Sequence, residues 1–505
     1  MGLLRYSGKE TLTFETPLDL PMGLLMHVPD RDGIVRLLGK VNLRGELKKT
    51  GYGTLLIEAP FHAYEGWFDD FWNRPNRWNG KRSLILQLDG GTLGIAPDSL
   101  KDKQFGFYVS DDSELFALNG NINISWDLFI DPDAHLDVIG DPNDLTPLSI
   151  TFSGDKYDHG TINQRSYGDL IFEGTDHFKG TINTYGTDKD GKKYGRLVLN
   201  GDTGANIEMN GGEIAGRGRT RGKLIARDGA IISPGDNDGA GTLIFGNVDF
   251  DSSTILNFKL GLPNVVGNSQ NDLIQVNGSL TLAGTVNIQA QPKFGPGVYR
   301  LFDYDGQLTY KGLTLGTFPG GIDYNFQFQT SIDHQINLIV GSNRTGGPVF
   351  WNGRTTPNGQ INGGSGIWDN TKPNFTDSSG NAYNQLWNGD VAIFGGSSGA
   401  VSVTVPINFN GIQFTTSDYI ITASSSGSLN TTSDAFVRVP ANATATIAAP
   451  ITGSIRIKQG RGRNTIPDRK RHIYRSNDRL QRHLISWGNS YKEQCCCQRQ
   501  WRPWR

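Results

Sequence analysis

Three tryptophans, Trp67, Trp72 and Trp78, are the residues of this 505-residue chain whose type and spacing could support a binding site. The first two enclose the segment 67–72, in which four of the six residues are aromatic and two are aspartates. Flat aromatic rings can stack on sugar rings, so this cluster is a possible glycan-stacking site, with neighbouring carboxylates available for chemistry. The favoured alternative is that the rings pack against the fold, because large aromatic side chains more often serve burial.

Paired carboxylates, the groups that glycan hydrolases use, occur at Asp69-Asp70, Asp111-Asp112 and Asp131-Pro132-Asp133. Adjacent strand residues point to opposite faces, so such pairs converge only in turns. The eight histidines show neither metal-ligand spacing nor the order of a Ser/His/Asp triad. We therefore predict no catalytic residue, no metal ligand and no cofactor.

Two glycine-rich segments resemble ligand loops only in part. Residues 186–193 nearly match a phosphate-binding loop, but Lys193 stands where a Ser or Thr is needed and no helix pattern follows. Residues 236–239 begin like a calcium loop but lack the later ligands and the closing Glu. Both segments are predicted to be ordinary polar turns.

The element that must position these residues is a short strand that recurs along the chain. A Gly followed by alternating apolar residues begins at Gly168, Gly195 and Gly222, which are equally spaced along the chain. Similar phrases begin at Gly241 and Gly278. A strand this short cannot bury its apolar face alone, but strands from successive coils can cover one another. The fixed period predicts an all-β solenoid whose strands pair in parallel from coil to coil.

Composition agrees with a turn-rich β protein, because glycine is 66 of 505 residues and charged residues are only 19%. The chain contains no apolar run of about 18 residues that could form a membrane-spanning helix. Residues 1–29 lack the pattern of a signal peptide, so no export signal is recognised.

Four short sequence segments, in a fixed order along the chain, resemble those of a known family. They are residues 229–235, 241–243, 272–278 and 297–302. Together they resemble the passenger region of bacterial autotransporters, the type V secretion family. The resemblance implies a right-handed parallel β-helix carried to the cell surface or exterior, with a C-terminal β-barrel in the outer membrane. We recognise no such barrel in this chain.

A second module follows the linker-like residues 341–347. Its Trp351-Asn-Gly353, Gly366-Ile-Trp368 and Trp387-Asn-Gly389 resemble the tryptophan-rich repeats of large alphaproteobacterial autotransporter passengers. We therefore predict an N-terminal β-rich segment, a solenoid module, a linker, a second Trp-containing solenoid module and a basic disordered tail, at residues 1–100, 101–340, 341–347, 348–455 and 456–505.

The tail differs in character from the rest. It holds 14 Lys or Arg against three acidic residues, a net +11 within an overall −2, and all three cysteines, Cys495, Cys496 and Cys497. Recoding residues 469–484 one base out of frame can give Gly-Asn-Ala-Thr-Tyr-Thr-Gly-Ala-Thr-Thr-Val-Ser-Ser-Gly-Thr-Leu, which is similar to the autotransporter-associated β-strand repeat. We favour a frameshift near Gly460 over a nucleic-acid-binding arm; the coding DNA tests this.

Two functions follow from this interpretation. The first is a fragment of a non-enzymatic surface or secreted passenger, a β-helix stalk that either mediates adhesion to host or neighbouring-cell molecules or simply extends away from the cell. It has no nucleic-acid partner and no membrane contact except through a barrel. The alternative is a β-helix enzyme or binder of polysaccharides that uses the three tryptophans. Turnover in a glycan panel favours the alternative. Open strand edges at the solenoid ends also predict aggregation or proteolysis on expression.

Overall fold

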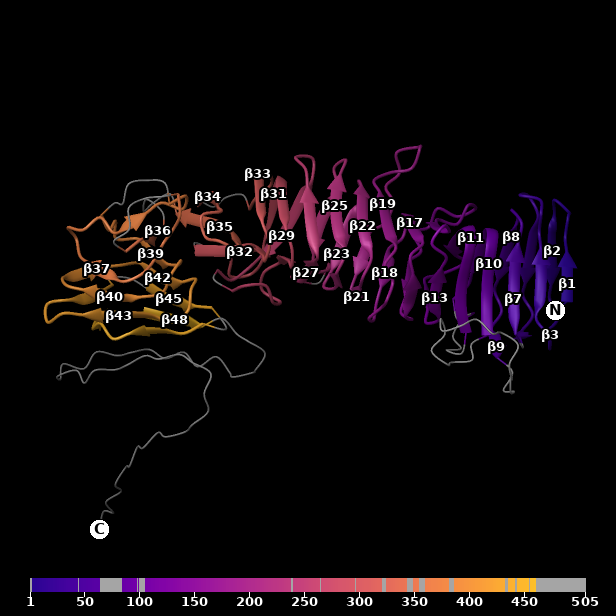
Figure 1. The fold of residues 1–505 in the computed structure, drawn as a ribbon, viewed down its shortest axis with the longest axis horizontal. Helices are drawn as coiled ribbons and strands as arrows, with labels where there is room; N and C mark the ends of the chain where they lie inside the picture. Colours follow the sequence, from indigo (N-terminus) through magenta and orange to yellow (C-terminus); the bar gives the residue numbers. More distant parts are fainter. Residues whose placement is uncertain are drawn as a thin grey trace, which may run out of the picture.

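The computed structural model describes residues 2–459 except 44, 64–83, 98, 100–104, 238, 264, 296, 320–323, 343–347, 354–358, 381–385, 432–434, 441–442 and 454. Every regular element in these ranges is a β-strand. Figure 1 shows the strands stacked one after another along an elongated molecule. The predicted all-β parallel solenoid is confirmed, since strands pair with the next coil rather than with their sequence neighbours.

The first solenoid has three sides, and a coil places up to one strand on each. The first side holds β1 (Gly2–Arg5), β4 (Leu24–His27), β7 (Glu46–Thr50), β13 (Asp127–Ile130), β16 (Lys156–Asp158), β21 (Asp202–Thr203), β24 (Arg219–Thr220), β27 (Thr242–Phe245), β30 (Leu273–Val276) and β32 (Gly297–Tyr304). The second holds β2 (Thr11–Phe14), β5 (Ile34–Leu37), β8 (Thr54–Ile57), β14 (His135–Ile139), β17 (Thr161–Arg165), β19 (Thr181–Tyr185), β22 (Asn206–Asn210), β25 (Lys223–Arg227) and β28 (Asn247–Phe250). The third holds β3 (Leu18–Leu20), β6 (Val41–Leu43), β9 (Phe61–Ala63), β12 (Ile122–Ile124), β15 (Ile150–Phe152), β18 (Leu170–Phe172), β20 (Leu197–Leu199), β23 (Glu213–Gly216), β26 (Ile231–Pro234) and β29 (Ile255–Leu260).

Four long strands bend around a corner and join two sides. They are β10 (Leu84–Ile95), β11 (Phe105–Ala117), β31 (Leu280–Ala290) and β33 (Leu308–Leu315). The bend in β31 falls at Gly284, whose φ of 132° suits glycine and where a Cβ would lie 2.5 Å from the Thr254 carbonyl oxygen. The boundary predicted at residue 100 lies between β10 and β11, which pair with each other, so the N-terminal strands continue the same solenoid.

The core is a set of inward columns, one apolar side chain per coil. On the third side the parallel register aligns fully buried residues from successive strands: Ile150, Leu170, Leu197, Ile214, Ile232 and Leu256. Such columns form one continuous apolar cluster from Met26 to Val340. Each coil therefore buries the face of the next, as the sequence pattern predicted.

The predicted fixed period is wrong beyond its first step. Leu170 pairs with Leu197, which is one full period away, but Leu197 pairs with Ile214, which is much nearer along the chain. Leu224, the third member of the predicted series, lies on the second side and pairs with Ile207. The physical requirement is that inward side chains align, whereas the polar turns between strands can differ in length from coil to coil.

Lys49 occupies an inward position of the core and is fully buried. Its ammonium group donates hydrogen bonds to the carbonyl oxygens of Gly51, at 2.5 Å, and Gly90, at 2.8 Å. Burial lowers the pKa of Lys49 from 10.5 to about 8. Lys49 is therefore charged near neutral pH, and burying its ammonium group costs desolvation free energy.

A pH-dependent stability follows from Lys49. Below pH 8 the lysine is charged in both folded and unfolded chains, while between pH 8 and 10.5 the folded chain loses its proton first. The free energy of unfolding should therefore rise over this interval, by roughly 3 kcal/mol relative to a Lys49→Met variant. Urea unfolding of both proteins at pH 7.5 and 10.5, followed by circular dichroism, measures the difference; parallel pH profiles would contradict it.

The second module is a smaller three-sided solenoid. One side holds β36 (Val349–Trp351), β39 (Val391–Phe394), β42 (Gly411–Phe414), β45 (Ala435–Val439) and β48 (Ile455–Gln459). A second side holds β37 (Gly366–Trp368), β40 (Ala400–Val403), β43 (Tyr419–Ala423) and β46 (Ala445–Ile447). The remaining side holds β41 (Pro406–Asn408), β44 (Ser428–Asn430) and β47 (Ile451–Thr452). Trp351 and Trp368 are fully buried and pack on Phe375 and Phe394, so these tryptophans form its core.

The two solenoids meet through a separate apolar cluster. It joins Val298 and Ile339 of the first solenoid with Phe350, Val391 and Ile393 of the second. The predicted linker overlaps β35 (Gln335–Ser342), and residues 343–347 lie outside the described residues. In Figure 1 the strands of the second module run across the direction of those in the first.

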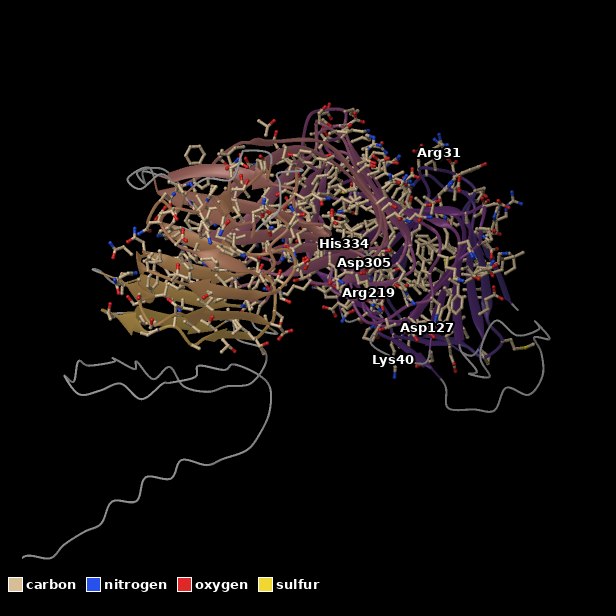
Figure 2. All side chains as sticks on the ribbon, turned by 60° about the vertical axis from the view of Figure 1, so that its left-hand side comes forward. Arg31, Lys40, Asp127, Arg219, Asp305 and His334 are labelled. Atoms are coloured by element: carbon tan, nitrogen blue, oxygen red, sulfur yellow. The ribbon has the colours of Figure 1, made fainter. Side chains whose placement is uncertain are left out.

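Among the described strand pairs, three are antiparallel, and all three lie near this junction. They are β32 with β35, β34 (Tyr324–Gln329) with β35, and β36 with β38 (Phe375–Thr376). Among the described residues, exposed side chains such as those of Arg31 and Lys40 point away from the ribbon (Figure 2). Within the described residues, no helix is long and apolar enough to cross a membrane.

Candidate functional site

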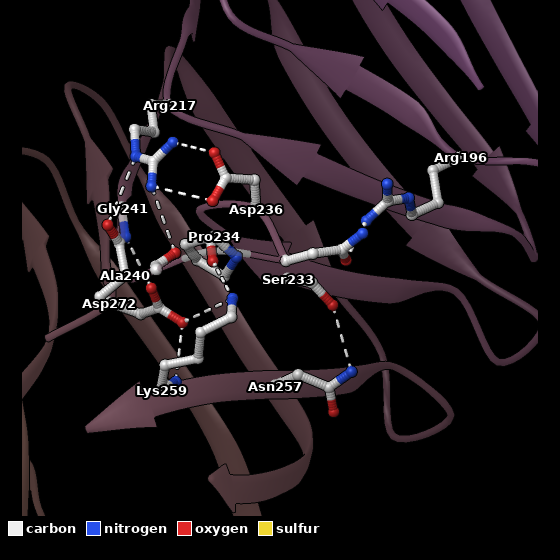
Figure 3. Close-up of polar contacts among 12 residues, drawn as sticks. Arg196, Arg217, Ser233, Pro234, Asp236, Ala240, Gly241, Asn257, Lys259 and Asp272 are labelled. Carbon is white, nitrogen blue, oxygen red and sulfur yellow. Dashed lines mark hydrogen bonds and ion pairs between the residues drawn. The ribbon is translucent and has the colours of Figure 1, made fainter. Parts of the chain in front are cut away.

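A polar groove crosses the third side of the first solenoid. Outward side chains of consecutive coils line its floor, namely Ala215 on β23, Ser233 on β26, Asn257 on β29 and Asn287 on β31. Its margins are formed by Arg196, Glu213, Asp236, Asn237, Lys259, Gln289 and Thr317. We refer to this site as the third-side groove; Figure 3 shows part of it.

Hydrogen bonds between neighbouring coils connect the floor into a ladder. The Asn287 amide donates to Asn257 Oδ1 at 3.0 Å, and the Asn257 amide donates to Ser233 Oγ at 3.1 Å. Asn287 Oδ1 accepts the backbone N–H of Thr317 at 2.8 Å. An amide has two N–H groups and two acceptor lone pairs, so each asparagine retains one donor and one acceptor after these contacts.

Arg196 and Asp236, two of the charged side chains at the margins, each have a partner of opposite charge. Arg196 binds the Asp169 carboxylate at 2.7 Å and donates to Asn237 Oδ1 at 3.2 Å. The hydrogen bonds with Asp169 raise the pKa of Arg196. Asp236 accepts two hydrogen bonds from the Arg217 guanidinium. These contacts hold the margins in place.

A buried carboxylate fixes the wall next to Lys259. Asp272 accepts the backbone N–H groups of Gly241 and Lys259, both at 2.7 Å, and lies 3.6 Å from the Lys259 ammonium. That ammonium also donates to the Pro234 carbonyl oxygen at 2.9 Å. Burial raises the pKa of Asp272 to about 6, against the effect of these donors. Asp272 thereby ties β29 to the turn after β26 (Figure 3).

The residues predicted to stack on glycans are not placed by the structure. Trp67, Trp72 and Trp78, together with the pair Asp69-Asp70, lie within 64–83, outside the described residues. Their role in glycan stacking stays a prediction.

The other carboxylate pairs lie in strand β11, at Asp111-Asp112, and in the turn after β13, at Asp131-Pro132-Asp133. Asp112 accepts the backbone N–H of His135 at 3.0 Å and lies 2.9 Å from the Nδ1 of that ring, while Asp111 accepts the N–H of Asp112 at 2.8 Å. Asp131 accepts the hydroxyl of Tyr108 at 2.5 Å. The contacts of Asp112 and Asp131 link successive coils.

The two partial loop motifs are turns. In 186–193, Asp188 accepts the backbone N–H groups of Asp190 and Lys192, both at 2.9 Å, and a β-bridge joins Thr187 to Lys193. In 236–239, a bridge joins Asp236 to Gly239. Among the described residues, no three His, Cys, Asp or Glu side chains gather as a possible metal site.

Sequence reasoning missed the third-side groove because its residues are spread from Arg196 to Thr317 and become neighbours only once the coil register is known. One signal was present. The strands 255–260 and 285–290 each carry an asparagine between apolar residues at the same outward position, and a side-chain amide ladder is a usual way to fill such positions in stacked strands.

The chain matches no protein-family model. It is 35% identical over 209 residues to a protein described as "Adhesin BmaC autotransporter", from Brucella suis biovar 1 (strain 1330). The match covers 39% of this chain and 6% of that relative, so the chain spans a small part of its length. The resemblance to autotransporters predicted from the sequence is confirmed by this similarity.

Proposed function

We propose that this chain is part of an autotransporter passenger that provides an adhesive surface outside the cell, without enzymatic activity. The observation that carries the proposal is the similarity to an autotransporter adhesin. A solenoid with one continuous core from Met26 to Val340 supports it, because such a fold presents an extended surface built from successive coils.

The experiment is display of the full chain on the surface of a non-adherent bacterium, through a leader and a barrel from an unrelated autotransporter. Bacteria that carry the chain should bind cultured epithelial cells at least several-fold more than bacteria that carry the leader and barrel alone. Flow cytometry of an epitope tag measures the amount of displayed protein, so that strains with equal display are compared. Binding no greater than that of the barrel control would refute the proposal.

The enzymatic alternative is tested with the same material. Purified chain is incubated with a panel of polysaccharides, and new reducing ends or unsaturated products are measured. Turnover that is lost in a Trp67→Ala/Trp72→Ala/Trp78→Ala variant would support the alternative instead.

A further inference from the structure

We propose that the third-side groove binds an uncharged oligosaccharide, with the amides of Asn257 and Asn287 as the main recognition groups. The inference rests on the proposed adhesive function and names the ligand class of one site on that surface. It depends on three properties of the groove: its remaining hydrogen-bonding groups, its charge and its rigidity.

The remaining hydrogen-bonding groups suit hydroxyls. After the ladder contacts, Asn257 and Asn287 each keep one N–H and one lone pair, and they lie one coil apart. Successive coils place equivalent side chains about 4.8 Å apart, which is close to the length of one sugar residue. A saccharide hydroxyl both donates and accepts, so a sugar chain lying across the coils can use both kinds of group at each step.

The charge of the groove favours an uncharged ligand. The charged residues that line it are Arg196, Lys259, Glu213 and Asp236, which sum to zero. Three of these residues have partners of opposite charge. Arg196 pairs with Asp169, Lys259 with Asp272, and Asp236 with Arg217. A polyanion such as a sulfated glycan or a nucleic acid needs a concentrated positive field, which this arrangement does not supply.

The floor also disfavours an apolar ligand. Its aromatic and aliphatic lining residues, Phe258 and Ile288, are 1% and 5% exposed and belong to the core. The outward groups between them are amides, a hydroxyl and the small side chain of Ala215. A lipid or an apolar peptide side chain would cover these amides and the hydroxyl without giving them hydrogen-bond partners, which costs free energy.

The groove is preformed by its supporting contacts. Asp272 holds the Lys259 wall through two backbone N–H groups at 2.7 Å, and the amide ladder fixes the floor. A preformed site loses little conformational entropy on binding, which suits recognition by hydrogen bonds alone. We expect dissociation constants of about 0.1–1 mM for a single site, with avidity from many copies on one cell.

The test is isothermal titration calorimetry of the full chain with maltohexaose, cellohexaose, chitohexaose and a heparin hexasaccharide. At least one neutral hexasaccharide should bind, and the Asn257→Ala/Asn287→Ala variant should weaken it at least about tenfold. The matched control is Asn163→Ala/Asn183→Ala, which removes an equivalent amide ladder, with a 2.8 Å contact, on the second side. The control should bind as the unaltered chain does, and circular dichroism must show both variants folded.

Three results would overturn the inference: no neutral probe binds, heparin binds more tightly than every neutral probe, or the two double variants lose binding equally. The display assay separates this inference from the proposed function. If the Asn257→Ala/Asn287→Ala chain still mediates full cell adhesion, the groove is not the adhesive site and the adhesive function stands. If the unaltered chain mediates none, the proposed function fails whatever the groove binds.

Discussion

Replacing Phe172 with alanine is expected to lower the free energy of unfolding by about 3–5 kcal/mol. Phe172 is 1% exposed, lies in register with Phe152 and Leu199 of the neighbouring coils, and its ring centroid is 5.8 Å from that of Phe152. Alanine would leave a cavity between three coils, and the rigid parallel ladder on each side limits collapse into it.

The matched control for Phe172 is its neighbour. Ile171 precedes it on β18 but faces outward and is half-buried, so Ile171→Ala should cost about 1 kcal/mol or less. Urea unfolding monitored by circular dichroism compares the two variants. Hydrogen exchange locates the effect, with loss of protection expected first at β15, β18 and β20. Equal destabilisation by the two variants would contradict the inward column as the source of stability.

Replacing Asp176 with alanine is expected to cost a similar amount, about 3–5 kcal/mol, because it leaves the buried Lys156 without its counter-ion. The two side chains are 2% and 1% exposed, with the ammonium and carboxylate 3.8 Å apart. Lys156 also donates to the carbonyl oxygens of Gly154, at 2.8 Å, and Glu173, at 3.0 Å. Burial lowers the pKa of Lys156 and raises the pKa of Asp176, so each charge depends on the other to offset its desolvation.

A surface pair on the second side provides the comparison for Asp176. Arg165 and Asp137 lie 3.1 Å apart, with 42% and 23% of their side chains exposed. Water screens such a pair, so Asp137→Ala should cost about 1 kcal/mol or less. Thermal unfolding of the two variants measures the contrast. If Asp176→Ala is no more destabilising than Asp137→Ala, Lys156 is satisfied by the carbonyl oxygens alone.

The strands could be predicted from the sequence, and the coil lengths could not. Phrases such as Gly168–Phe172 and Gly195–Leu199 show the alternation of a half-buried strand, and both strands form. Alternation specifies which residues face inward but not which coil a strand joins. The short coil between Leu197 and Ile214 shows that a brief turn satisfies the same packing as a long one.

The inward lysines were also beyond sequence reasoning. Lys49 follows Lys48 in a segment that looks solvent-exposed, yet it is fully buried. What permits this is local backbone geometry at the corner, where carbonyl oxygens of Gly51 and Gly90 turn toward the ammonium group. Hydropathy alone cannot report such acceptors, because they belong to residues up to 41 positions away.

The third-side groove shows the same limit for function. Each of its residues is unremarkable where it stands in the chain, and only the register places Ser233, Asn257 and Asn287 in one row. The aromatic residues of segment 67–72, in contrast, are adjacent in the sequence, so they can be recognised without knowledge of the fold. Sites built across a solenoid are therefore found by aligning coils rather than by scanning for motifs.

The direction of the backbone hydrogen bonds has a mechanical consequence. In parallel coils these bonds run along the length of the rod, from one coil to the next. Tension applied between the two ends is therefore carried in series, with every coil bearing the whole force. The strength of the rod is set by its weakest junction, and under traction the coils should peel apart one after another rather than yield together.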